Sequence, residues 1–295
     1  MTEIDVAIIG AGPAGIQAAI HAARKKVSVI LIGKTVNSAL FGAHIENYFG
    51  VLGKKNGDEL LKDGIAQAES FGCKTLDENV ISTSRSGDLF QIVTENDVFI
   101  TARAIIIATG ISRVKLGVPG EKEFFGKGVS YCAACDCNFY RGKTVVIVGD
   151  ETEAAVSSEL MTKYASEVFW VTKDTKASKF VVDKASVAGV KTVKAKIESI
   201  EGSTRVERVV LENGETIQTS GVFIELGAKS AADLAMDLDV LPEMDDTIKV
   251  DQNCATIVKG VFACGDVTGK PWQVAKAVGQ GAVAGIAAAD MIRGA

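Results

Sequence analysis

The sequence contains only two histidines, carries no excess of positive charge and has no long apolar run. His21 and His44 are too few and too far apart to indicate a metal site or a catalytic triad, so core or surface roles are expected. The net charge of −5 argues against nucleic acids and anionic membranes as partners. The most apolar tract, residues 282–292, includes Asp290 and is too short to span a bilayer. The acidic N-terminus, residues 1–5, does not resemble a signal peptide, so we expect a cytoplasmic location.

The sequence has six cysteines, and two of them, Cys132 and Cys135, are separated by two residues in the middle of the chain. Such a pair can close a small disulfide, and one of its thiols often has a lowered pKa. Asp136 follows directly and is placed to exchange a proton with a sulfur atom. The same spacing is half of a zinc site, but no second pair completes four ligands, so no metal is expected. A thioredoxin fold uses this spacing near its start, and a structural disulfide is expected mainly in secreted chains.

One pattern of strand, glycine-rich turn, helix and strand occurs twice. Its first copy spans residues 5–32, and its second spans residues 144–171. A hairpin and a further buried strand follow each copy. The repeat predicts an α/β protein with two related Rossmann-like nucleotide-binding domains. We expect strands at residues 5–10, 27–32, 89–94, 98–101, 104–108, 144–148, 168–171 and 221–227, and helices at 16–25, 57–71, 154–164 and from 273 onward.

The first turn, Gly10-Ala-Gly-Pro-Ala-Gly15, has the glycine spacing of a dinucleotide-binding turn. Its glycines permit the tight turn, the close approach of a pyrophosphate and close packing of the helix on the strand. The alternative is a glycine-rich turn without a ligand. Gly33, at the end of the second strand, stands where an acidic ribose-binding residue is usual.

Six landmarks together resemble the low-molecular-weight, FAD-containing thioredoxin reductases, in the order of that family. They are Gly10–Gly15, Ile45–Gly50, Ala108–Gly110, Cys132–Asp136, Phe262–Asp266 and Gln273 with its following helix. The resemblance implies an FAD domain made of residues 1–113 and 242–295. It also implies an inserted domain, residues 114–241, that carries the cysteine pair. The fold would be that of the pyridine nucleotide-disulfide oxidoreductases, and the protein would be a homodimer.

The resemblance also implies roles for single residues. Cys135 would face flavin C4a, Cys132 would attack the disulfide of thioredoxin, and Asp136 would be the acid/base. For Asp136, a helix cap or a solvated carboxylate is the alternative. Gln273 would begin the helix whose N–H groups point at the flavin. The implied FAD contacts are Gly10, Gly12, Pro13, Ala14, Gly15, Gly33, Lys34, Asn47, Ala108, Thr109, Gly110, Gly265, Asp266, Gln273 and Val274.

The second domain departs from the family at its nucleotide turn, which reads Gly149-Asp-Glu-Thr-Glu-Ala154. Glu151 replaces a glycine that the pyrophosphate of NADPH requires. A carboxylate ~4 Å from a phosphate costs about 4 kcal/mol at an effective dielectric of 20, or about a thousandfold in affinity. No arginine for the 2′-phosphate follows Val171, and Trp272 stands where the family has an arginine before Gln273.

These losses resemble the branch of the family that does not use pyridine nucleotides. We therefore expect an FAD-dependent thioredoxin reductase that takes electrons from ferredoxin, flavodoxin, a deazaflavin or an unidentified donor. One alternative is an NADH- or NADPH-dependent reductase with an unusual turn. Another is a non-catalytic flavoprotein redox sensor, although a sensor would not need the intact acid/base at Asp136.

The remaining cysteines are expected to play smaller parts. Cys137 can form an alternative disulfide with Cys135 or remain an inert thiol, and the second role is favoured. Cys73, Cys254 and Cys264 are expected to pack as small apolar residues.

Overall fold

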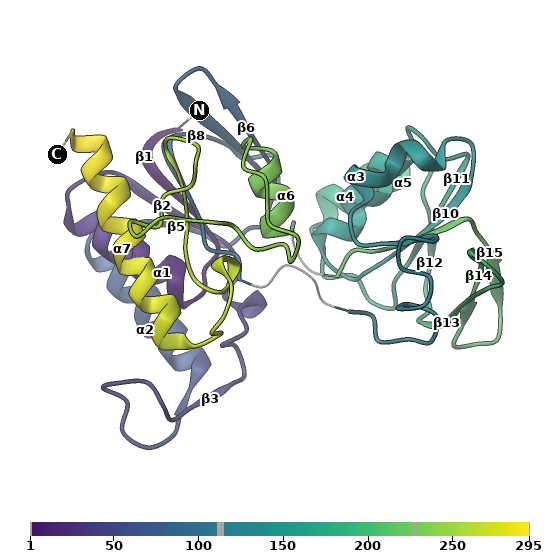
Figure 1. The fold of residues 1–295 in the computed structure, drawn as a ribbon, viewed down its shortest axis with the longest axis horizontal. Coiled ribbons are helices and arrows are strands. Elements are labelled where there is room, and N and C mark those ends of the chain that lie inside the picture. The colour runs from purple at the N-terminus through teal and green to yellow at the C-terminus, as the bar shows by residue number, and fades with distance from the viewer. Residues whose placement is uncertain (1, 111–114, 227–228, 295) are drawn as a thin grey trace. The chain divides into compact units, whose positions relative to one another are not determined.

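The computed structural model describes residues 2–110, 115–226 and 229–294. The chain folds into two compact units, drawn in Figure 1. Unit 1 consists of Met1–Ser112 and Lys229–Ala295, and unit 2 is Arg113–Ala228. Both units are Rossmann-like α/β domains, and the second is inserted into the first, as the sequence predicted.

The second boundary of the inserted unit differs from the prediction, which placed it at residues 241–242. Helix α6 (Ala231–Met236) belongs to unit 1, where the Asp237 carboxylate that follows it accepts a hydrogen bond of 3.2 Å from the Thr83 N–H. Apolar side chains on and after α6 pack in the core of unit 1: Ala231, Leu234, Ala235, Leu238 and Val240. Because these side chains share a core with strand β8 (Phe99–Ile107), the boundary lies at residues 228–229.

A seven-stranded sheet forms the centre of unit 1. Its order is β5-β2-β1-β8-β7-β6, and β17 also pairs with β8. The other strands are β1 (Thr2–Ile9), β2 (Val29–Ile32), β5 (Lys74–Leu76), β6 (Val80–Ser86), β7 (Leu89–Thr94) and β17 (Val261–Ala263). The first half of β8 pairs antiparallel with β7, and its second half pairs parallel with β17. The predicted strands at 98–101 and 104–108 are therefore one strand with two different neighbours.

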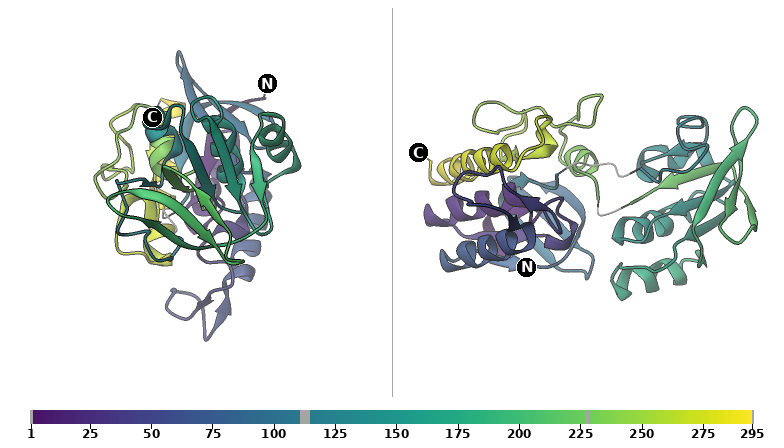
Figure 2. Two further views of the ribbon diagram at one scale, coloured as in Figure 1. Left: turned by 90° about the vertical axis from the view of Figure 1, so that its right-hand side faces the viewer. Right: turned by 90° about the horizontal axis from the view of Figure 1, so that it is seen from below.

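Three helices cover one face of this sheet, as Figure 2 shows: α1 (Pro13–Arg24), α2 (Gly57–Ser70) and α7 (Val274–Arg293). α7 approaches α1 closely because it has glycine at the contact. A Cβ at Gly281 would lie 2.2 Å from the Ala14 carbonyl oxygen, and one at Gly285 would lie 2.3 Å from that of Ala18. Glycine at these two positions therefore allows the backbones of α7 and α1 to approach closely. Beside the same layer, β3 (His44–Ile45) and β4 (Lys55–Asn56) pair within a long loop.

Unit 2 is built on a five-stranded parallel sheet of order β12-β11-β10-β16-β9, with a second, antiparallel sheet β13-β14-β15. Residues of the central strand β10 alternate between two cores: Val145 and Ile147 pack with the helices, and Val146 and Val148 pack with the antiparallel sheet. The strands are β9 (Val129–Ser130), β10 (Thr144–Val148), β11 (Glu167–Val171), β12 (Lys191–Val193), β13 (Ile197–Gly202), β14 (Val206–Leu211), β15 (Thr216–Gln218) and β16 (Gly221–Ile224). The helices are α3 (Ala133–Asp136), α4 (Thr152–Met161) and α5 (Lys179–Val187).

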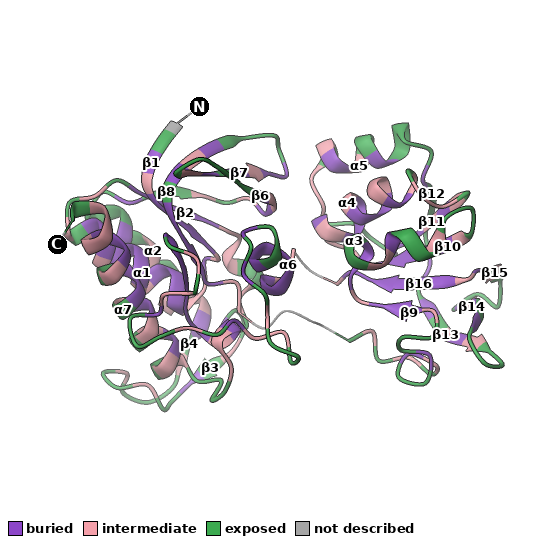
Figure 3. Ribbon diagram, turned by 45° about the horizontal axis from the view of Figure 1, so that its top comes forward, coloured by how far each residue is buried: buried purple, intermediate pink, exposed green. Residues whose placement is uncertain are grey.

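The buried strands were the easiest elements to predict. β2 and β16 are buried at every residue, which Figure 3 shows in purple, and both were predicted as continuous apolar runs. The elements that the sequence pattern did not predict include β5, β6, β12, β13, β17, α5 and α6. In the part of the chain that the structure describes, no helix combines the length and the apolar character needed to cross a membrane.

Candidate active site

The turn after β1 packs directly against the end of β8. Gly10 has φ of 115°, and a Cβ there would lie 2.4 Å from the Ala108 carbonyl oxygen. A Cβ on Gly15 would lie 1.9 Å from the carbonyl oxygen of Gly10 itself. The fold alone therefore requires glycine at both positions, whether or not a ligand binds.

Gly12 is different, because among the described residues an added Cβ would crowd only a side chain and no backbone atom. Its backbone is extended (φ −88°, ψ −176°), and the nearest atom to an added Cβ is the Ser38 Oγ at 3.3 Å. Gly12 directly precedes α1, which begins with Pro13. A side chain at this position would cover the start of the helix, so glycine keeps these N–H groups accessible to a phosphate.

Two oxygen atoms beside this turn are buried and have no hydrogen-bond partner among the described residues. They are Oγ1 of Thr109 and Oδ1 of Asp266. Burial raises the pKa of the Asp266 carboxyl, and the nearby Lys276 ammonium opposes this rise. Asp266 follows Gly265, which contacts the turn because a Cβ there would lie 2.8 Å from the Ala14 Cβ. Buried oxygens without partners are costly, so both atoms fit a site completed by the hydroxyl groups of a bound molecule.

Side chains on one face of α7 hold the loop that carries Asp266. Lys276 Nζ donates to the carbonyl oxygens of Gly265 (2.8 Å) and Gly269 (2.5 Å). Gln280 Oε1 accepts hydrogen bonds from Gly265 N–H (3.0 Å) and from the Thr268 hydroxyl (2.9 Å). The sequence analysis missed Lys276 and Gln280. Their spacing of four residues, one helical turn after Gln273, is the signal that points to them.

The other predicted contacts in unit 1 divide into two groups. Asn47 and Gln273 are brought together, since Asn47 Nδ2 donates to Gln273 Oε1 at 3.2 Å, and Gln273 is the residue immediately before α7, which begins at Val274. Lys34 is placed differently, because its Nζ lies 2.6 Å from Oε1 of Glu95, a carboxylate that is 1% exposed. The Lys34 ammonium is therefore neutralised within unit 1.

A cavity of about 430 Å³ lies beside the glycine-rich turn. Gly33, with φ of 151°, and Ala11 line it at the ends of β2 and β1, and Leu61 and Ile65 of α2 close one side. Asp77 also lines this cavity, directly after β5, the neighbour of β2. An acidic residue is usual at the position of Gly33, and in this chain Asp77, after the adjacent strand β5, brings a carboxylate to the same cavity. The position of Asp77 in the sequence did not indicate this.

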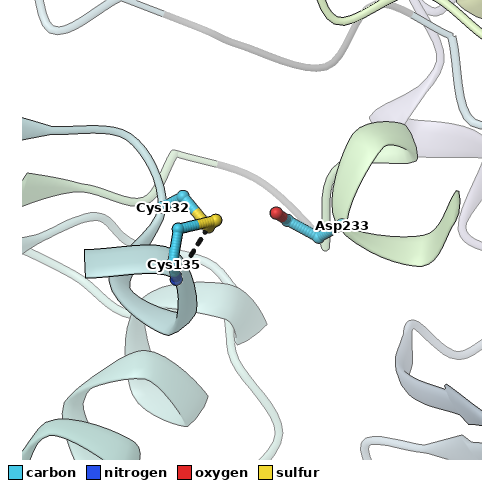
Figure 4. Close-up of side chains that lie close together, drawn as sticks. All are labelled: Cys132, Cys135 and Asp233. Atoms are coloured by element: carbon cyan, nitrogen blue, oxygen red, sulfur yellow. Dashed lines mark hydrogen bonds between the residues drawn. A yellow bond between two sulfur atoms is a disulfide. The ribbon is translucent and has the colours of Figure 1, made fainter. Parts of the chain in front are cut away.

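In unit 2, Cys132 and Cys135 form a disulfide, with their Cα atoms 5.4 Å apart. Figure 4 shows the disulfide at the start of α3 and the Cys135 N–H that donates to the Cys132 Sγ (3.2 Å). The side chain of Ser130 accepts the Cys132 N–H at 3.1 Å. Cys132 is buried and Cys135 is exposed.

Asp136 ends α3 and is partly exposed. Its side chain makes no capping hydrogen bond to the following helical turn, so the structure does not show the helix-cap role that the sequence left open.

Cys137 is buried against the helices of unit 2, and its thiol donates a hydrogen bond to the Ala134 carbonyl oxygen (3.4 Å), which agrees with an inert thiol. Burial raises the pKa of the Cys73 thiol to about 12 and that of Cys254 to about 11, and it also raises the pKa of Cys264.

The turn after β10 has the backbone of a nucleotide-binding turn, but carboxylates occupy it. Glu151 immediately precedes α4 and has an extended backbone (φ −107°, ψ −178°). Its carboxylate is 12% exposed and lies 3.4 Å from the Lys176 Nζ, which is also 3.0 Å from the Asp150 carboxylate. The hydrogen bond to Asp150 raises the pKa of Lys176. Charged groups of the chain itself therefore pair with one another directly before α4.

A family model described as pyridine nucleotide-disulphide oxidoreductase matches residues 4–281. The chain is 34% identical to a thioredoxin reductase of Treponema pallidum, over 99% of this chain and 98% of that one. It is similar to the crystal structure of an atypical thioredoxin reductase of Desulfovibrio vulgaris (TM-score 0.84, 35% identity, covering 99% and 98% of the two chains). It also matches a ferredoxin-flavin thioredoxin reductase of Clostridium acetobutylicum over the full length of both chains (TM-score 0.71, 32% identity).

Fold, disulfide and comparisons together define a flavoprotein oxidoreductase that acts on disulfides. The chain belongs to the pyridine nucleotide-disulphide oxidoreductase family, and its relatives there are thioredoxin reductases.

Proposed function

We propose that this protein is an FAD-dependent thioredoxin reductase whose electrons come from a donor other than NADPH. The observation that carries the proposal is Glu151, whose carboxylate stands where the pyrophosphate of NADPH would need glycine. The candidate donors are reduced ferredoxin, flavodoxin and a reduced deazaflavin. The enzyme would work in the cytoplasm as a homodimer.

Unit 1 supports FAD as the cofactor. Gly12 leaves the first N–H groups of α1 accessible for the pyrophosphate, and the cavity beside Gly33 has room for the adenosine half. Thr109 Oγ1 and Asp266 Oδ1, both buried without partners among the described residues, would bind the ribityl hydroxyls. When bound, FAD accepts electrons from the donor and delivers them to the disulfide.

The cysteines of unit 2 would complete the reaction. Reduction of the Cys132–Cys135 disulfide takes two electrons and two protons and gives a dithiol. In the proposed order, the Cys132 thiolate attacks the disulfide of thioredoxin and releases one thioredoxin thiol. Cys135 then attacks Cys132, which frees the second thioredoxin thiol and restores the disulfide. Asp136 would carry a proton to or from these sulfurs.

Unit 2 offers three obstacles to NADPH. Glu151 places a carboxylate on the residue immediately before α4, and the Asp150 carboxylate adds a second negative charge. The Lys176 ammonium already bridges these two carboxylates. The loop after Val171 contains no arginine to bind a 2′-phosphate. The similar structures from Desulfovibrio and Clostridium, called atypical and ferredoxin-flavin reductases, are in keeping with such a donor.

The test is an anaerobic donor screen with thioredoxin as acceptor. The purified protein is mixed with NADPH, NADH, reduced ferredoxin, reduced flavodoxin or a photoreduced deazaflavin, and new thioredoxin thiols are counted. We expect turnover with at least one of the last three and not with either nicotinamide. Failure of the chemically reduced flavoprotein to reduce any thioredoxin would contradict the reductase assignment itself.

A further inference from the structure

Unit 2 contains a buried carboxylate in direct contact with the segment that bears the redox cysteines. Glu225 lies immediately after β16 and is 5% exposed. Its Oε1 accepts a hydrogen bond from the backbone N–H of Ala133 at 2.8 Å. Ala133 is the residue directly after Cys132, so one peptide unit joins the bonded N–H to the redox cysteine. Glu225 has no role in the reaction as described above.

The backbone of Glu225 is fixed as firmly as its side chain. Its N–H bonds the Val148 carbonyl oxygen at 2.9 Å. Its own carbonyl oxygen would lie 2.0 Å from a Cβ on Gly149, which has φ of 159°. Glu225 is thus held between the end of β10 and the cysteine segment, and its carboxylate has little freedom to move away from Ala133.

The N–H groups around the disulfide are divided among different acceptors. Cys135 donates its N–H to the Cys132 Sγ (3.2 Å), and Asp136 donates its N–H to the Cys132 carbonyl oxygen (3.3 Å). The N–H of Ala133 is instead taken by the Glu225 carboxylate. N–H groups near a thiolate lower the pKa of its thiol, whereas a buried negative charge nearby raises it.

We propose that Glu225 is a positioning residue that fixes the Cys132–Cys135 segment and limits formation of the Cys132 thiolate. The proposal rests on the proposed reductase function, because only a reaction through thiols makes this control consequential. Glu225 holds Ala133 in place, which sets the geometry in which Cys135 N–H reaches the Cys132 sulfur. Its charge opposes a second negative charge on the neighbouring cysteine. The reduced pair therefore stays in the dithiol form longer, and the disulfide forms less readily by reaction with adventitious oxidants.

The experiment uses the holoprotein with its disulfide reduced under argon. Iodoacetamide labelling of Cys132 and Cys135 is followed by peptide mass spectrometry from pH 5 to pH 10 in wild type, Glu225→Gln and Glu225→Asp. Glutamine keeps the shape and an oxygen acceptor for Ala133 but removes the charge, whereas aspartate keeps the charge on a shorter side chain. Glu167→Gln, on the opposite end of the parallel sheet, controls for removal of one negative charge.

We expect the labelling midpoint of Cys132 to fall by about one pH unit in Glu225→Gln, so that labelling below the midpoint is about tenfold faster. The disulfide potential should become less negative, because the reduced form gains stability as a thiolate. Glu225→Asp and Glu167→Gln should keep the wild-type midpoint. An unchanged midpoint in Glu225→Gln, or an equal fall in Glu225→Asp, would overturn the role of the charge. If Glu225→Gln does not fold, Glu225→Met, which also removes the charge at similar length, takes its place: the same fall in the midpoint is expected, and an unchanged midpoint would overturn the role of the charge. Labelling needs neither donor nor thioredoxin, so its outcome is independent of the donor screen.

Discussion

Gly12 and Glu151 occupy equivalent backbone positions in the two units. Each is the residue immediately before the first helix that follows a glycine turn, and each is extended, with ψ of −176° and −178°. In unit 1 this position carries no side chain, and the start of α1 is accessible. In unit 2 it carries a carboxylate that pairs with Lys176. The same backbone position thus carries no side chain in one unit and a paired carboxylate in the other.

Replacing Glu151 with glycine should restore nucleotide affinity to unit 2. Any residue adopts an extended backbone, so Glu151→Gly introduces no strain. Removal of the carboxylate should tighten NADH binding by about tenfold to a thousandfold, as the Coulomb estimate allows. Titration calorimetry with NADH measures this gain. Glu167→Gln is the control, since it removes a negative charge far from this turn. Equal NADH affinity in wild type and Glu151→Gly would show that the carboxylate is not the obstacle.

The two redox cysteines should give different trapping behaviour with thioredoxin. Cys135→Ser leaves Cys132 without its resolving thiol, so it should hold thioredoxin as a stable mixed disulfide. Cys132→Ser should not. Non-reducing gels with a thioredoxin that lacks its own resolving cysteine measure the adduct. Cys135 is the exposed member of the pair in this structure, and trapping by Cys132→Ser instead would reverse the proposed roles.

Thr109 should contribute to FAD binding and not to the stability of the FAD-free protein. Thr109→Val removes a buried hydroxyl that has no partner among the described residues. We expect FAD affinity to fall by about 2–10-fold, the value of one hydrogen bond, with no loss in melting temperature without FAD. Thr219→Val is the matched control, because the Thr219 hydroxyl bonds the carbonyl oxygens of Thr144 and Gly221. It should lower stability and leave FAD affinity unchanged. The same pattern in both variants would refute this assignment.

The Asp266 carboxyl should destabilise the FAD-free protein at neutral pH, where it is ionised, and not at acidic pH, where it is protonated. Burial raises the pKa of this carboxyl in the folded state, so its ionised form costs stability above that pKa and costs nothing below 3.8. Asp266→Asn should therefore raise the melting temperature of FAD-free protein at pH 7, and the gain should shrink as the pH falls toward 4.

Asp245 provides a control of opposite sign for Asp266. Hydrogen bonds from Thr247 lower the pKa of this exposed carboxyl. Asp245→Asn should lower stability at pH 7, and this loss should persist to about pH 4, because the native advantage of the ionised form disappears only as the pH falls below 3.8. Melting curves of the two FAD-free variants between pH 4 and 8 make the comparison. Lower stability of Asp266→Asn at pH 7 would contradict the cost assigned to the Asp266 carboxylate.

The repeated Rossmann-like pattern was predictable because it is local. Buried strands appear in the sequence as apolar runs. Glycines such as Gly10 and Gly149 occupy positions where a side chain would collide with a backbone carbonyl oxygen. The boundary at 228–229 was not predictable, because the sequence of the short, Ala-rich helix α6 does not show whether it packs in the core of unit 1 or of unit 2. β6 was missed because its outer half, Thr83 to Ser86, is polar.

The candidate sites were predictable where a motif marks them and not where a distant partner completes them. The cysteine pair and Gly12 stand in recognisable spacing. Glu225 lies 92 residues from Ala133, and Lys176 is 25 residues from Glu151, so only the folded sheet brings these pairs together. No motif in the sequence singles out Glu225 or Lys176, because glutamate and lysine are common surface residues.

The most direct test of the central claim is rapid mixing of the oxidised holoprotein with NADPH under argon. Flavin absorbance is followed in a stopped-flow instrument, and reduced ferredoxin or a photoreduced deazaflavin is mixed in parallel to show that the flavin is competent. We predict that micromolar NADPH leaves the flavin oxidised over minutes while at least one of the other donors bleaches it. Bleaching by NADPH within seconds, coupled to reduction of thioredoxin, would contradict the account and make this protein an ordinary NADPH-dependent reductase.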